Sequence, residues 1–173
     1  MDGDCTRPAG ARRDLVALVG GALVVRVRYL LVVIDGRKPL SDADQYLDIA
    51  RNVAKGSGVA MQWPQLNVHP TAFRPPVFPL LLGGWMKVFG TSVTTARFLN
   101  VVIGLAVVAA IYHVGRRLGG RTAGLVAAGL VAVYPPLLAN DATTLAEPLG
   151  LLLLVGMLAA FMSRRWWALG LLG

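Results

Sequence analysis

The sequence predicts an all-α fold, a polytopic transmembrane helical bundle with one large loop outside the membrane. Of the 173 residues, 55% are hydrophobic and only 15% are charged, and the mean hydropathy is +0.61. Soluble domains of this size are on average less apolar and more highly charged. The apolar residues also form long runs, as membrane-spanning helices require. We therefore expect a single membrane domain over residues 1–173.

Four apolar segments approach the roughly 20 residues that a helix needs to cross a bilayer. They cover residues 15–34, 93–114, 122–139 and 145–162. The first has no small-residue cleavage site, which favours an uncleaved span over a signal peptide. A fifth run begins at Trp166-Trp167, typical of an interfacial aromatic belt, and stops at Gly173. We therefore expect the chain to be the N-terminal fragment of a longer fold.

The positive charge of the chain indicates its topology rather than a nucleic-acid partner. The net charge is +8, and the arginines cluster beside apolar runs at positions 12–13, 116–121 and 164–165. Nucleic-acid binding would require a basic face or arm, whereas cytoplasmic loops of membrane proteins prefer Lys and Arg. We expect no nucleic-acid partner and a multi-pass protein of the cytoplasmic membrane. Residues 1–14 would form a cytoplasmic tail, with the N-terminus inside.

A further apolar stretch, residues 76–90, is predicted to lie at the membrane surface. If it crossed the bilayer, the second and third arginine clusters would fall outside, against the preference for cytoplasmic arginine. Its 15 residues, interrupted by Pro79, Gly83, Gly84 and Lys87, are also short for a span. The loop over residues 35–92 is therefore expected outside, together with a short loop over residues 140–144.

Within the large loop, residues 44–55 are predicted to form an amphipathic helix on the bilayer. Their apolar members recur at the spacing of one helical face: Tyr46, Ile49, Ala50 and Val53. Ser41 with Asp44 resembles a capping box, and residues 56–58 supply glycines that end the helix. The prolines at positions 64, 70, 75 and 76 favour an extended, irregular chain over residues 59–76.

Charged residues of the two external loops are the candidates for chemistry: Asp42, Arg74, Asp141 and Glu147. Each has a structural alternative. An acid in the first turn of a helix is stabilised by the helix dipole and by unpaired backbone N–H groups, which suits Asp42 and Glu147. Arg74 could equally be an interfacial anchor whose charge snorkels to water.

Several short motifs follow one another along nearly the whole chain from residue 15 onward. They are Asp42-x-x-x-Tyr46-x-x-Ile49-Ala50-Arg51-Asn52, Arg74-Pro75-Pro76-Val77-Phe78-Pro79, Ala96-Arg97-Phe98-Leu99-Asn100, Gly115-Arg116-Arg117-Leu118, Tyr134-Pro135-Pro136 and Ala146-Glu147-Pro148-Leu149. In order and spacing they resemble the GT-C glycosyltransferases of the protein-mannosyltransferase and aminoarabinose-transferase type. The resemblance implies a membrane enzyme that transfers a hexose or pentose from a polyprenyl-phosphate donor, with residues 35–92 as its catalytic-type loop.

The resemblance also implies roles for individual residues. The family's acid/base candidate, an Asp four residues before a Tyr, falls on Asp42, with Tyr46 as a substrate-binding candidate. The family often has Asp-Glu at this point, whereas this chain has Asp42-Ala43, which leaves the second acid without an equivalent. The basic residue before Pro-Pro, associated with the donor phosphate, falls on Arg74. The acid before Pro at the start of the fourth span falls on Glu147, with Asp141 as its companion.

These residue types suit the implied reaction. A polyprenyl-phosphate sugar leaves as a phosphate, so the enzyme must counter negative charge and remove a proton from the acceptor hydroxyl. A carboxylate can act as that general base. Arginine binds phosphate oxygens in a bidentate manner and stays charged. The expected partners are thus the sugar donor and membrane lipid, while a glycan, lipid or protein acceptor is left open.

The remaining polar residues leave alternatives. Arg26 and Arg28 lie in the second half of the first span, and we expect them to snorkel outward rather than to face a donor phosphate. They would also suit a non-catalytic membrane module, such as a transporter part or a lipid-binding scaffold, and an inactive fragment is a further alternative. His69 is isolated and reads as structural, or as a substrate contact within the loop. No metal-ligand spacing occurs, so no cofactor is implied, and the need for a divalent cation is left open.

Overall fold

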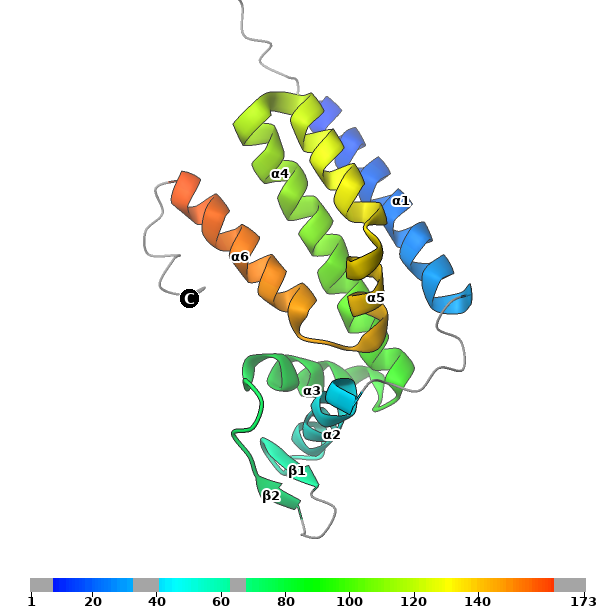
Figure 1. The fold of residues 1–173 in the computed structure, drawn as a ribbon, viewed down its shortest axis with the longest axis vertical. Helices are drawn as coiled ribbons and strands as arrows, with labels where there is room; N and C mark the ends of the chain where they lie inside the picture. The colour runs from blue at the N-terminus through cyan, green and yellow to red at the C-terminus, as the bar shows by residue number, and fades with distance from the viewer. Residues whose placement is uncertain (1–7, 33–40, 63–67, 164–173) are drawn as a thin grey trace, which may run out of the picture.

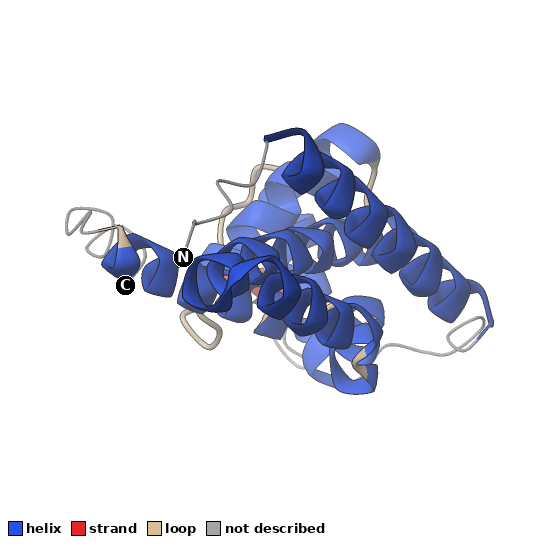
Figure 2. Cartoon of the chain, turned by 90° about the horizontal axis from the view of Figure 1, so that it is seen from above, coloured by secondary structure: helices blue, strands red, loops and turns tan. Residues whose placement is uncertain are grey.

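The structure, a computed structural model, describes residues 8–32, 41–62 and 68–163 (Figure 1). Its helices are α1 (Pro8–Val32), α2 (Ser41–Ala54), α3 (Val77–Phe89), α4 (Val93–Val133), α5 (Pro135–Thr143) and α6 (Glu147–Met162). Two short strands, β1 (Ala60–Gln62) and β2 (Val68–Pro70), form an antiparallel ribbon in which Met61 lies opposite His69. Helices make up most of the described chain (Figure 2), which confirms the all-α prediction. The ribbon was not predicted, because residues 59–76 were expected to form an irregular chain.

α4 is a helical hairpin rather than one straight rod. Gly119 and Gly120 leave helical geometry, and Gly120 has a φ of 77°, a region open to glycine at little cost. Past this turn the chain runs back along itself. The close approach of the two arms is shown at Gly124, where a Cβ would lie 2.8 Å from the carbonyl oxygen of Tyr112. In a straight helix these two residues would be about 18 Å apart. The two arms of the hairpin cover the predicted segments 93–114 and most of 122–139 (Figure 1).

Within the part of the chain that the structure describes, two helices are long and apolar enough to cross a membrane. They are α1, over Gly10–Val32, and α4. α3, with 13 residues, and α6, with 16, are shorter than a usual span. The structure therefore supports two candidate spans by length and composition, and the prediction of four spans remains a prediction. The fifth run, from Trp166, lies outside the described residues.

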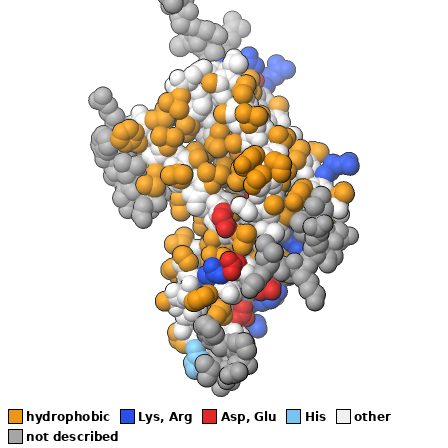
Figure 3. Space-filling view, in the orientation of Figure 1, with side chains coloured by type: hydrophobic (Ala, Val, Ile, Leu, Met, Phe, Trp, Pro, Cys, Tyr) orange, Lys and Arg blue, Asp and Glu red, His pale blue; other side chains and the backbone are white. Residues whose placement is uncertain are grey.

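The apolar bundle is formed by α1 packed along both arms of α4, with α5 and α6 beside them (Figure 1). Its interior consists mostly of small side chains, which let the helices approach closely, together with one tyrosine: Ala22, Val108, Tyr112, Ala128 and Ala132. Large apolar side chains also cover the outside of the bundle, as Figure 3 shows over its upper part. An outer surface of this kind is expected where the solvent is lipid rather than water.

A second layer, made of α2, α3 and the ribbon, closes one end of the bundle (Figure 1). α2 is amphipathic as predicted, since Leu47 and Ala50 are buried while Asp44 is exposed. The helix begins at Ser41, three residues earlier than expected. It crosses α3 closely at Gly83, where a Cβ would lie 2.5 Å from a methyl carbon of Val53. α3 lies across the end of the bundle in Figure 1, and its predicted place at the membrane surface remains a prediction.

Candidate functional site

The beginning of α2 carries three side chains of the candidate site on one face. Asp42, Gln45 and Tyr46 stand at positions i, i+3 and i+4, which are neighbours on a helix surface. Tyr46 is buried against Phe78 of α3, with ring centroids 5.2 Å apart in an edge-to-face arrangement. The side chain of Asp42, by contrast, is 58% exposed. The beginning of α2 is therefore anchored by the tyrosine and presents its carboxylate outward.

Arg74 completes the cluster from the segment before α3. Its Nη2 donates to Oδ1 of Asp42 at 2.5 Å, and its Nε donates to Oε1 of Gln45 at 2.8 Å. The guanidinium carbon also lies 5.3 Å from the ring centroid of Tyr46, within the range of a cation–π contact. The structure thus brings together three residues that the sequence analysis selected separately: Asp42, Tyr46 and Arg74.

Gln45 is a member of this cluster that the sequence analysis did not select. Its amide oxygen fixes the orientation of the guanidinium while Asp42 takes a second N–H group. The signal was available in the sequence, since Gln45 follows Asp42 by three residues on the same helical face. With Gln45 and Tyr46 holding Arg74, the site offers an accessible carboxylate next to a fixed cation.

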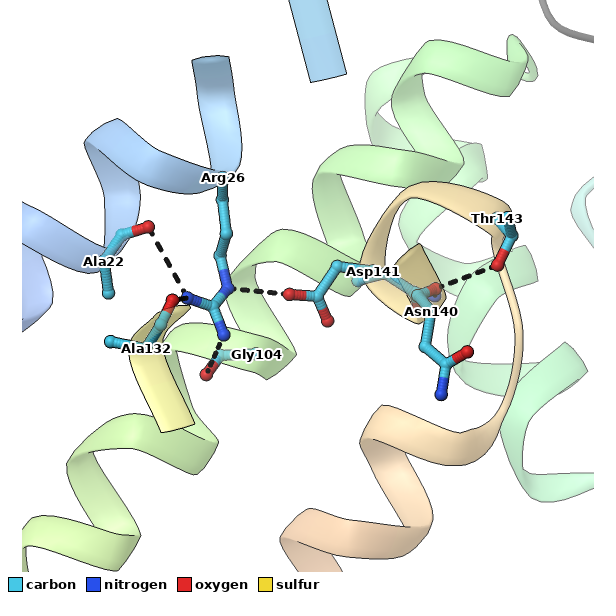
Figure 4. Close-up of polar contacts among 8 residues, drawn as sticks. Ala22, Arg26, Gly104, Ala132, Asn140, Asp141 and Thr143 are labelled. Carbon is cyan, nitrogen blue, oxygen red and sulfur yellow. Dashed lines mark hydrogen bonds and ion pairs between the residues drawn. The ribbon is translucent and has the colours of Figure 1, made fainter. Parts of the chain in front are cut away.

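Asp141 belongs to a different site, inside the bundle. Its Oδ2 lies 2.7 Å from Nε of Arg26, and the two side chains are only 3% and 1% exposed (Figure 4). Residues 140–143 are the last turn of α5, so the short loop expected over residues 140–144 is mostly helical. The structure turns Asp141 toward α1 rather than toward Arg74, and its predicted catalytic role remains a prediction.

The expectation that Arg26 snorkels outward is wrong. Its Nη1 also donates to the carbonyl oxygens of Ala22 and Ala132, at 3.5 and 3.3 Å, and its Nη2 donates to that of Gly104 at 3.5 Å. Because an internal carboxylate and three carbonyls satisfy the guanidinium, it has no need to reach the membrane surface. Arg28, two residues on, is exposed.

Gly104 makes the buried pair sterically feasible. A Cβ at this position would lie 2.5 Å from Oδ2 of Asp141 and 2.9 Å from Nε of Arg26. Any side chain there would occupy the space of the ion pair. This role could not be predicted from the sequence, since a glycine in an apolar helix does not indicate which neighbour approaches it.

Glu147 and His69 lie apart from the contacts of Arg74. Glu147 is the exposed first residue of α6, and its neighbours Ala146 and Leu149 pack against the apolar cluster that contains Tyr46, at the end of the bundle closed by α2 and α3. His69 is exposed on β2. Their predicted roles remain predictions. Among the residues that the structure describes, no three His, Cys, Asp or Glu side chains are grouped to hold a metal ion.

Asn100 fixes the connection between α5 and α6 to the first arm of α4. This residue is fully buried, and its Nδ2 donates to the carbonyl oxygens of Asn140 and Leu145, at 3.3 and 3.0 Å. The start of α6, including Glu147, is thereby held at a defined place on the bundle. In the sequence, Asn100 stands out only as part of a motif.

The apolar bundle and the charged cluster at its end define a helical membrane protein with a polar site at one surface. The family model described as dolichyl-phosphate-mannose-protein mannosyltransferase matches residues 73–172, and the chain belongs to this family. The resemblance drawn from the motifs is thereby confirmed. The family consists of membrane glycosyltransferases that use a polyprenyl-phosphate sugar donor. No curated protein and no solved structure matches the chain.

Proposed function

We propose that the chain transfers a sugar from a polyprenyl-phosphate donor to an acceptor hydroxyl at the outer face of the cytoplasmic membrane. In this proposal Asp42 is the general base and Arg74 binds the donor phosphate. One observation supports it above all: a carboxylate that is 58% exposed touches an arginine held from the other side by Gln45. Acid and cation stand at the end of an apolar bundle, where a lipid-linked sugar would meet water.

The reaction needs both groups within a few ångströms of the same carbon atom. The acceptor oxygen forms a bond to the anomeric carbon while the bond from that carbon to the phosphate oxygen breaks. The acceptor proton moves to the carboxylate of Asp42, and the electron pair leaves with the phosphate, whose charge Arg74 counters. Because Asp42 and Arg74 are in direct contact, one sugar can lie next to both.

The matched family segment contains part of this site. It includes Arg74, Asp141 and Glu147. It begins after Asp42, Tyr46 and His69. The role of Asp42 therefore depends on the motif and on its contact with Arg74, and it is the residue to test first.

The test replaces Asp42 by Asn in the full reading frame that encodes these residues. An amide cannot accept the proton, so turnover with a polyprenyl-phosphate sugar in membranes should fall by about 10²- to 10⁴-fold. Asp44→Asn is the matched control, because Asp44 is an exposed acid in the same first turn of α2. Near-normal turnover of folded Asp42→Asn protein would reject the proposed base.

The outer-face assignment is a separate part of the proposal and needs its own test. The assignment rests on the preference of arginine clusters for the cytoplasmic side of a membrane. The clusters of this chain all lie on that side only if residues 35–92 lie on the other. Ser57 is exposed at the end of α2 and can be changed to Cys after Cys5 has been replaced by Ser. An impermeant thiol reagent should label Ser57→Cys in intact cells. Labelling only after the membrane is opened would contradict the assignment.

The rival function, a transporter part or lipid-binding scaffold, is no longer supported by Arg26. That alternative relied on intramembrane Arg26 and Arg28 as groups available to a substrate. Arg26 is instead occupied by Asp141 and by backbone carbonyls. An inward-facing arginine of this kind contributes to packing of the bundle rather than to a pathway through it.

A further inference from the structure

A cavity of about 640 Å³, widely open to the molecular surface, lies between α1 and the second arm of α4. Its walls consist of a few charged and a few apolar residues: Gly10, Arg13, Asp14, Ala17, Leu18, Arg121 and Leu125. These come from the beginning of α1 and from just after the turn of the α4 hairpin. That end of the bundle is opposite to the end closed by α2 and α3 (Figure 1). The cavity is therefore separate from the Asp42–Arg74 site.

The walls of the cavity change from charged to apolar over one helical turn. On α1, Arg13 and Asp14 are followed four residues later by Ala17 and Leu18. On α4, Arg121 is followed four residues later by Leu125, so the same order is repeated on the opposite wall. Residues four apart lie one above the other on a helix. The cavity thus has a charged mouth at the end of the bundle and an apolar interior toward its middle.

A network of polar contacts fixes the charged mouth. Asp14 accepts from Nε and Nη2 of Arg121 at 2.7 and 2.8 Å, and the hydroxyl of Tyr112 donates to Oδ2 of Asp14 at 3.2 Å. Nη1 of Arg116 in turn lies 3.1 Å from the Tyr112 hydroxyl oxygen. The Arg121 guanidinium is held at the wall by this network. Arg13 adds a second, exposed cation to the same cavity.

The surroundings of the mouth carry an excess of positive charge. Among the described residues of this end, five arginines accompany the single acid Asp14: Arg12, Arg13, Arg116, Arg117 and Arg121. Such a field attracts anions, and arginine pairs with phosphate oxygens more specifically than lysine does. Basic pockets between membrane helices are suited to anionic lipid headgroups.

We propose that this cavity binds one anionic phospholipid, with its phosphate at Arg13 and Arg121 and the upper part of an acyl chain against Ala17, Leu18 and Leu125. A soluble anion would use only the charged mouth, whereas an amphiphile also fills the apolar interior one turn deeper. The order of residues on both walls therefore favours a lipid over free phosphate. The site is distinct from the proposed donor site, and its ligand belongs to the opposite membrane surface.

The test compares variants of the 173-residue chain purified in a neutral detergent. Native mass spectrometry would measure retention of phosphatidylglycerol, with phosphatidylcholine and inorganic phosphate as separate arms. Arg13→Gln removes a cation from the cavity and should weaken phosphatidylglycerol binding about fivefold. Arg12→Gln is the matched control, because it removes the same charge from the neighbouring exposed residue, which does not line the cavity. Ala17→Phe fills the apolar interior and should also weaken binding.

The expected pattern is specific to the cavity. Arg12→Gln should bind like the unchanged chain, phosphatidylcholine should bind less than phosphatidylglycerol, and millimolar phosphate should not compete. Equal losses in Arg12→Gln and Arg13→Gln would show a general attraction of charge and overturn the proposal. So would full competition by inorganic phosphate, or unchanged binding in folded Ala17→Phe protein. Melting curves of each variant exclude a loss caused by unfolding.

Discussion

Two of the arginine–aspartate pairs among the described residues, Arg26–Asp141 and Arg74–Asp42, use the same chemical groups in opposite surroundings. In the bundle, Arg26 and Asp141 are 1% and 3% exposed, with 2.7 Å between their nearest atoms. At the end of the bundle, Arg74 and Asp42 are 21% and 58% exposed at a comparable separation. The geometry of an ion pair therefore says little about its role, while burial distinguishes the two. Solvent reaches the outer pair, and the inner pair is closed by helices.

The energetics of the two pairs should differ for the same reason. A charge in a low-dielectric interior is tolerated only while its partner is present, so breaking a buried pair is costly. An exposed pair exchanges its partner for water and loses little. We expect the inner pair to determine stability and the outer pair to determine activity, and three experiments test this difference.

The largest effect on stability should come from Asp141→Ala. It leaves the guanidinium of Arg26 buried without its carboxylate and should cost about 3 to 5 kcal/mol. Thermal unfolding of the purified chain in detergent would measure the loss. As a control, combining Arg26→Met with Asp141→Leu removes both charges and should restore much of the stability. If the Asp141→Ala protein unfolded at the same temperature as the original chain, the pair would not stabilise the fold.

A smaller effect is expected from Gly104→Ala. The added methyl group would lie 2.5 Å from Oδ2 of Asp141, so the pair must shift, and overpacking of this kind costs about 1 to 3 kcal/mol. Gly129→Ala is the matched control in the other arm of α4, since a Cβ there meets nothing within 4 Å. That control should be neutral or slightly stabilising. Equal unfolding temperatures for both variants would contradict the tight packing at Gly104.

The smallest effect concerns the outer pair. A double-mutant cycle with Asp42→Asn and Arg74→Gln should give a coupling free energy of about 0.2 to 1 kcal/mol at low salt. Because the pair is open to solvent, the coupling should shrink further at about 1 M salt, where the Debye length is only about 3 Å. Unfolding of the four proteins at two salt concentrations measures it. A coupling as large as that of the inner pair would remove the contrast.

Individual residues of the candidate site could be predicted from the sequence, whereas the contacts between them could not. The amphipathic spacing from Tyr46 onward located α2, because a helical face leaves a periodic signal along the chain. Asp42 and Arg74 were both selected, but only the fold shows that they touch across 32 positions. Arg26 and Asp141 are 115 positions apart, and each residue alone suggested an outward-facing or loop position. Local pattern carries no information on such a partner.

Turns and short elements were predicted unevenly. The break between the second and third apolar segments was placed near the arginines of residues 116–121, and the structure sets the reversal at Gly119-Gly120. The ribbon was missed because strands of three residues are too short to show alternation. Its prolines also favoured irregular chain.

The distance along the chain between Arg26 and Asp141 has a consequence for biosynthesis. α1 is made first, so its arginine enters the bilayer region before the 115 further positions up to its carboxylate have been translated. At about 5 to 20 residues per second, that interval is on the order of ten seconds. During this interval the charge of Arg26 has no carboxylate partner, and it raises the free energy of inserting the first helix by about 2.5 to 3.5 kcal/mol. We therefore expect the arrival of α5 to fix the placement of α1, so that a segment made much later decides the final register of the first helix.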